Sequence, residues 1–143
     1  MSAQSRLGKM PTWQRCFTQL TMLSCSLTGI SYLTGHEFDI WRNLLGAHSM
    51  LAWHGIAGML AILALGSVLP FHLKAGLKSK RKMWSGMSQL VFLTALLITG
   101  ALLYYGPIHI RDFIIQTHWT VGLIFFVIFL FHGVISIKPK HEM

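Results

Sequence analysis

Acidic residues are scarce in this chain of 143 residues, which has 4 Asp and Glu against 12 Lys and Arg. Paired carboxylates for acid and base catalysis are therefore poorly supplied, and the sequence contains no phosphate-binding loop and no catalytic triad. Charged residues make up only 11% of the chain, whereas hydrophobic residues make up 53%. This balance does not suit a water-soluble domain and indicates a membrane protein.

Cysteine is also rare, because the chain has only Cys16 and Cys25. Nine residues apart on one helix, at about 100° per residue, they point to opposite sides and cannot form a disulfide. The sequence has no Cys-x-x-Cys-His, so no covalently attached c-type haem is expected.

Four apolar segments, at about 16–33, 47–73, 87–105 and 113–137, come near or above the roughly 20 residues that span a bilayer. The first segment is diluted by Thr and Ser, which suits a helix packed against protein. The sequence therefore predicts an all-α integral membrane four-helix bundle, with residues 1–143 as a single membrane domain.

Basic residues are distributed unevenly about these segments. Only Arg42 and Arg111 fall in the two connections that share one side of the membrane. On the other side lie Arg6, Lys9, Arg15, Lys74, Lys78, Lys80, Arg81, Lys82, Lys138 and Lys140. The positive-inside rule then predicts both termini on the cytoplasmic side of the membrane. Topology thus explains the net charge of +8, and nucleic-acid binding is not expected.

Two of the apolar segments carry pairs of histidines, His54 with His72 and His118 with His132. An imidazole in hydrocarbon is costly and usually functional. Spacings of 18 and 14 residues keep each pair on one helix face, separated by about 27 Å and about 21 Å. His48 lies about 120° from His54 around the helix and is the poorer candidate.

This arrangement favours haem ligation, because imidazoles that project inward from facing helices are typical axial ligands of b-type haem. His54 with His118 would hold an outer haem, and His72 with His132 a second haem nearer the cytoplasm. Pro70 stands before His72, where it would bend or end the helix and alter the spacing.

Short motifs recur in the same order in the two halves. His54-Gly-Ile-Ala-Gly58 resembles His118-Trp-Thr-Val-Gly122, and Thr28-Gly29 and Thr99-Gly100, each followed by an aromatic residue, precede them. The order predicts two parallel helix-pair repeats with a cofactor at their interface. Gly58 and Gly122 would leave room for a flat macrocycle, or would serve close helix packing.

Haem propionates need cations at the membrane surface. The basic candidates are Arg42 and Arg111 on the outer side and Lys78, Arg81 and Lys82 on the inner side. The alternative is that these residues serve topology and lipid head groups.

The spacing of His118 and His132, Thr99-Gly100 with Tyr104-Tyr105, and the doubled helix pair resemble the four-helix membrane-bound cytochromes b. This superfamily includes the membrane subunits of hydrogenases and formate dehydrogenases. The resemblance implies two haems b, with His54, His72, His118 and His132 as axial-ligand candidates. It also implies electron transfer in a bacterial inner membrane, between a quinone or quinol pool and a partner redox subunit. Whether the chain is itself an oxidoreductase stays open, because the sequence identifies no catalytic residue.

Two alternatives from other classes remain open. Intramembrane histidines also serve metal or proton transporters, although such a path requires acidic partners or a polar lining. A haem-free structural subunit of a membrane complex is the other alternative. The apolar surroundings of the histidines, such as 62–65 and 124–130, favour a buried planar cofactor.

Overall fold

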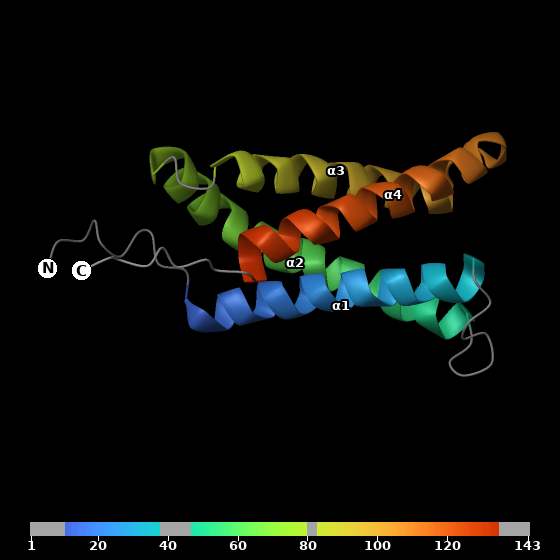
Figure 1. Cartoon of the computed structure of the whole chain (residues 1–143), viewed down its shortest axis with the longest axis horizontal. Helices are drawn as coiled ribbons and strands as arrows, with labels where there is room; N and C mark the ends of the chain where they lie inside the picture. Colours follow the sequence, from blue (N-terminus) through green and yellow to red (C-terminus); the bar gives the residue numbers. More distant parts are fainter. Residues whose placement is uncertain (1–10, 38–46, 80–82, 135–143) are drawn as a thin grey trace, which may run out of the picture. The chain divides into compact units, whose positions relative to one another are not determined.

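The computed structural model describes residues 11–37, 47–79 and 83–134, and these are helical except for Pro11 and the connection at Gly106 and Pro107 (Figure 1). The α-helices are α1 (Thr12–Glu37), α2 (Ala47–Ser79), α3 (Met83–Tyr105) and α4 (Arg111–Phe129). A short 3-10 helix, η2 (Ile108–Ile110), precedes α4, and a π-helical turn, η3 (Leu130–Val134), follows it. The predicted all-α class is confirmed.

All four helices lie where the hydrophobic segments predicted them, but their ends differ. The helix α1 is longer than 16–33 at both ends, and α4 begins before 113 and passes into η3 at Leu130. The helix α2 continues through Pro70 to Ser79, so Pro70 does not end it. A proline removes a single backbone donor, and the remaining hydrogen bonds and apolar packing carry the helix onward.

Three of the helices are long and apolar enough to cross a membrane, over His48–Pro70, Trp84–Tyr105 and Ile108–His132. The helix α1 does not reach that apolarity, so the sequence prediction of four spanning segments holds for three. Large apolar side chains such as Leu63 and Phe131 are more than 60% exposed, which indicates a lipid environment.

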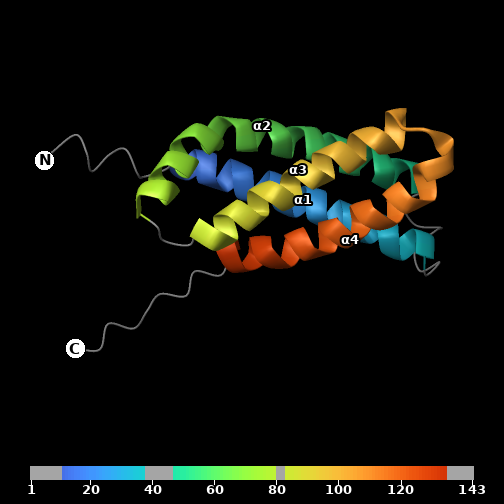
Figure 2. The ribbon, with the colours of Figure 1, turned by 90° about the horizontal axis from the view of Figure 1, so that it is seen from above.

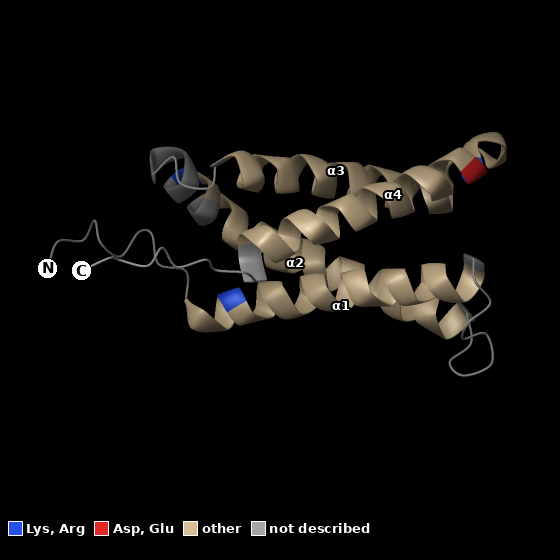
Figure 3. Cartoon of the chain, viewed as in Figure 1, with Lys and Arg blue, Asp and Glu red and all other residues tan. Residues whose placement is uncertain are grey.

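Charge is confined to the ends of the helices wherever the structure describes side chains (Figure 3). The charged residues described are Arg15, Lys74, Arg111 and Asp112. The basic residues at 42, 81, 82, 138 and 140 lie outside the described residues, as does the side chain of Lys78.

The chain divides into two compact units, Met1–Met83 and Trp84–Met143, each containing two long helices. In the first unit α1 and α2 run side by side (Figure 2). Ala57, Ala61, Ala64 and Val68 form a buried stripe along α2. Their alternating spacing of four and three residues is that of a coiled-coil seam, and small side chains allow the helix backbones to approach closely.

Threonines in α1 satisfy their own hydroxyl groups within the helix. Thr18, Thr21 and Thr28 donate to the carbonyls of Gln14, Phe17 and Ser24 at 2.9, 2.9 and 2.7 Å. This bonding to the preceding turn lets polar side chains lie against a neighbouring apolar helix without an unpaired donor.

The second unit reverses direction in a short connection between α3 and α4. The Gly106 N–H donates to the Leu102 carbonyl at 2.8 Å, and a Cβ at Gly106 would collide with that carbonyl oxygen. Arg111 Nη1 donates to the Leu103 carbonyl at 3.4 Å and so links the start of α4 to the end of α3.

Near the other end of α4, Phe125 and Phe129 stack with ring centroids 6.1 Å apart and are both buried.

Replacing Ala64 with leucine should destabilise the first unit, because Ala64 is 0% exposed and the larger side chain would overfill its site. We expect the free energy of unfolding to fall by about 1–3 kcal/mol. Thermal unfolding in detergent, followed by circular dichroism, measures the change. Ala52→Leu, at an exposed position of the same helix, is the matched control and should leave the unfolding midpoint nearly unchanged.

Candidate functional site

His54 lies on α2 with its ring against α1. The ring atom Nδ1 is 2.9 Å from the Cys25 carbonyl oxygen and 3.3 Å from Thr28 Oγ1. Cys25 Sγ lies 3.9 Å from the same nitrogen. Because a carbonyl oxygen can only accept, Nδ1 of His54 must carry the proton.

This bond fixes the form of the neutral imidazole. When Nδ1 carries the proton, Nε2 carries the lone pair. A histidine that binds a metal through Nε2 commonly donates Nδ1–H to a carbonyl or a similar acceptor, which orients the ring and raises its basicity. The first unit therefore presents His54 in the form that a metal ligand requires.

His118 makes a related contact in the second unit, with a threonine hydroxyl in place of the carbonyl. Its Nδ1 lies 2.8 Å from Thr99 Oγ1 on α3. That hydroxyl donates to the carbonyls of Ala95 and Leu96, at 2.8 and 3.2 Å. When its single proton is so directed, Thr99 Oγ1 can accept from Nδ1–H of His118, an arrangement that leaves the lone pair on Nε2.

His132 is the third histidine whose Nδ1 lies within hydrogen-bond distance of a hydroxyl group on the preceding helix. Its Nδ1 lies 2.8 Å from Ser85 Oγ on α3. The residue is part of the π-helical turn η3. Such turns are rare and often occur at functional sites.

A glycine follows each of the three hydroxyl residues and faces the same histidine. A Cβ added at Gly29 would lie 2.9 Å from Cε1 of His54, closer than real Cβ contacts allow. At Gly100 and Gly86 the corresponding distances are 3.6 Å to His118 and 3.5 Å to His132. We refer to each hydroxyl residue, its following glycine and the facing histidine as the His54, His118 and His132 sites.

The predicted glycines Gly58 and Gly122 face the neighbouring helix of their own unit. A Cβ at Gly58 would lie 3.8 Å from Cys25 Sγ, and one at Gly122 would lie 3.7 Å from Leu96 Cδ2. These contacts are those of close helix packing, which was one of the two interpretations of these residues. Room for a macrocycle stays a prediction.

The other predicted site residues are not part of these three sites. His48 is exposed near the start of α2 and is not brought to His54. The backbone of His72 belongs to α2, but its side chain lies outside the described residues, as does all of Arg42. Arg111 is exposed and bonded to the end of α3.

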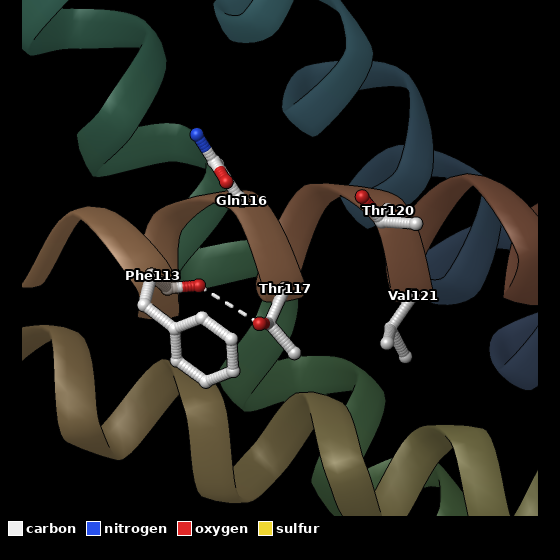
Figure 4. Close-up of a pocket in the computed structure, with 5 residues that line it drawn as sticks. All are labelled: Phe113, Gln116, Thr117, Thr120 and Val121. Atoms are coloured by element: carbon white, nitrogen blue, oxygen red, sulfur yellow. Dashed lines mark hydrogen bonds between the residues drawn. The ribbon is translucent and has the colours of Figure 1, made fainter. Parts of the chain in front are cut away.

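A shallow groove of about 250 Å³ runs along α4 (Figure 4). Its lining residues are Phe113, Gln116, Thr117, Thr120 and Val121. Thr117 donates to the Phe113 carbonyl at 2.8 Å, while Gln116 and Thr120 add polar atoms one turn apart. The groove is lined by this one helix, so it offers polar contacts without enclosing a ligand.

Sequence reasoning identified the histidines and the repeated Thr-Gly dipeptides but did not connect them. It missed Ser85 and Gly86 entirely. The signal was present in the spacing, since Ser85-Gly86 precedes Thr99-Gly100 by the same 14 residues that separate His118 from His132. The helices α3 and α4 run antiparallel, so 14 residues back along α3 and 14 residues forward along α4 cover the same distance. Ser85 is thereby brought to His132, as Thr99 is to His118.

In the metal-free protein, His54 and His118 should both be protonated at Nδ1, because each donates from that atom. Nitrogen NMR of histidine-labelled protein in detergent distinguishes the two ring tautomers. Thr99→Val removes the acceptor for His118, and the loss of about 1 kcal/mol should shift its tautomer ratio about fivefold towards Nε2–H. His54, which bonds to a backbone carbonyl, is the internal control; protonation at Nε2 in the wild type would refute the assignment.

Gly29→Ala should displace the His54 ring, because the new methyl group would lie 2.9 Å from Cε1. We expect a loss of about 1–3 kcal/mol in the free energy of unfolding. Gly100→Ala is the matched control, since its methyl group would make an ordinary contact at 3.6 Å and alanine favours the helix. Equal unfolding midpoints for the two variants would contradict the close contact at His54.

The sequence matches no protein-family model and no curated protein, and the structure matches no solved structure.

Proposed function

We propose that the chain is a b-type cytochrome of the bacterial inner membrane that carries electrons across the bilayer. The observation that carries this proposal is the bonding of Nδ1 in His54 and His118, which gives both imidazoles the form that binds iron through Nε2. Haem iron supplies the redox chemistry, since it accepts and releases one electron when axially ligated by imidazole.

The histidines fit haem in two respects. Their imidazole nitrogen is a suitable ligand for iron, and the bonding of Nδ1 leaves the lone pair on Nε2. Neutral imidazole nitrogen is the usual axial ligand of b-type haem, and helical bundles commonly supply such ligands from facing helices. We assign His54 and His118 as axial ligands of one haem and His132 as a ligand of a second, with His72 the candidate from sequence for the remaining position. Arg42 and Arg111 are the candidates for the propionates.

We also infer that the chain consists of two copies of one helix pair. Three contacts support this inference, because each has a counterpart in the other unit. His54 with Thr28 corresponds to His118 with Thr99, and the same histidines meet Gly29 and Gly100. The third correspondence is Gly58 against Cys25 and Gly122 against Leu96.

The asymmetry of the basic residues supports a topology with both termini in the cytoplasm. The proposed partners, a quinone or quinol and a second redox subunit, rest on the resemblance to membrane-bound cytochromes b. The chain's own residues would hold the haems, fix the ligand tautomers and exclude water through the apolar faces of α2 and α4. Those partners would donate the electrons to the chain and accept the electrons from it.

Purified protein should contain about two haems b per chain, measured as the pyridine haemochrome and by a reduced-minus-oxidised spectrum. His54→Ala and His118→Ala should each lose the same one of these haems, because each removes an axial ligand. His109→Ala, at an exposed position in η2, is the control and should keep full haem content. Protein without haem from a haem-replete host would refute the proposal and favour a transporter or a structural subunit.

A further inference from the structure

One face of α4 carries two neighbouring rows of side chains, each with its members four residues apart. Gln116 and Thr120 form one row, and Phe113, Thr117 and Val121 form the other (Figure 4). Both rows line the groove of about 250 Å³. Rows of this spacing are the ridges by which helices pack, and the groove between two ridges receives side chains of another helix. The groove therefore has the shape of one half of a helix–helix contact.

Four of the lining residues form the hole of a knobs-into-holes contact. Phe113, Gln116, Thr117 and Thr120 stand at positions i, i+3, i+4 and i+7 of the helix. In paired helices, one side chain of the facing helix enters a hole made by four residues. Phe113 is 67% exposed, and Gln116 and Thr120 are exposed as well, so no described side chain of the second unit fills the hole.

The polar groups on this face lie within an apolar span. Thr120 is the middle residue of the candidate membrane span Ile108–His132, and Gln116 stands about one turn before it. Each of the other threonines beyond the first turn of a described helix donates to a carbonyl of the preceding turn. Among the described residues, neither the Thr120 hydroxyl nor the Gln116 amide makes a hydrogen bond. In hydrocarbon, where water is absent, a second helix can supply the missing partners.

The exposed face continues beyond the middle of the span. From Thr120 it passes through Ile124, Val127 and Phe131, which are 43%, 52% and 62% exposed. These steps of four, three and four residues repeat the alternation along the buried seam of α2. Such alternation keeps one face of a helix against a single partner helix. From Phe113 to Phe131 the contact would extend over about 27 Å.

We propose that this face of α4 is the interface between two copies of the chain, which pair as a symmetric dimer in the membrane. Two copies inserted in the same direction are related by a two-fold axis along the membrane normal, which brings equal residues of the two helices to equal depth. An amide both donates and accepts hydrogen bonds, and so does a hydroxyl. Gln116 can therefore bond to Gln116 of the second copy, and Thr120 to Thr120. The face is self-complementary, and for this reason a second copy is its occupant.

The interface lies apart from the histidine site on the same helix. Gln116 and His118 are two residues apart, or about 200° around the helix, so they project in nearly opposite directions. His118 is turned towards Thr99 of α3. The inference goes beyond the proposed function without depending on it, since the pairing of two α4 helices requires no haem.

Sedimentation equilibrium of the full-length protein in density-matched detergent measures the dissociation constant of the dimer. Gln116→Leu should weaken the dimer about tenfold, because it removes hydrogen bonds between the copies but keeps an apolar helical side chain. Thr120→Val removes only a hydroxyl group and should weaken it about fivefold. Thr94→Val, at an exposed position of α3, is the matched control and should leave the dissociation constant unchanged.

Disulfide crosslinking in the host membrane identifies the face that pairs. Thr120→Cys, in a background with Cys16→Ser and Cys25→Ser, should give a crosslinked dimer when copper phenanthroline is added as the oxidant. The reason is that equal residues of the two helices meet along the seam. Thr94→Cys in the same background is the control and should remain uncrosslinked.

A monomeric wild type overturns the inference. So does a dimer that neither Gln116→Leu nor Thr120→Val weakens, and so does a Thr120→Cys variant that crosslinks only to a different protein. If Gln116→Leu fails to fold, Thr120→Val and the crosslink still decide. Haem content is a separate measurement: a dimer without haem refutes the cytochrome alone, and a monomer with two haems refutes the dimer alone.

Discussion

The hydrogen bond from Nδ1 of a histidine to the neighbouring helix is the interaction on which the arrangement of this chain depends. An imidazole between apolar helices has lost its hydration and must bond to the protein. The acceptor is the Cys25 carbonyl for His54 and the Thr99 hydroxyl for His118. One bond thereby links two helices, orients the ring and selects the tautomer.

The surrounding sequence serves that contact. Gly29 gives the His54 ring space against α1, and Ala57, Ala61 and Ala64 keep α2 close to the same helix. The threonine hydroxyl groups donate to carbonyls of their own helix, which leaves Thr99 Oγ1 able to accept a hydrogen bond. Small residues and self-bonded hydroxyl groups thus have a shared role, which is to bring two helix backbones close enough for one polar contact between them.

Much of the fold followed from the sequence, because long apolar segments have few alternatives to helices in a membrane. The histidines were identifiable for the same reason, since they are polar residues in apolar surroundings. Their partners were not, because Thr and Ser are common in such helices and only the packing of α1 on α2 and of α3 on α4 selects Thr28, Thr99 and Ser85. The predicted end of α2, at 73, falls short of Ser79 because Lys74, Gly76 and Lys78 do not continue the apolar segment.

The π-helical turn η3 gives His132 a backbone setting that His54 and His118 do not have, since those two lie within α-helices. A π-helix bonds residue i to residue i+5, so it holds more residues in each turn than the α-helix that it continues. A substitution that favours regular α-helix within Leu130–Val134 would therefore change the direction in which the His132 ring projects towards Ser85, without altering either of these residues.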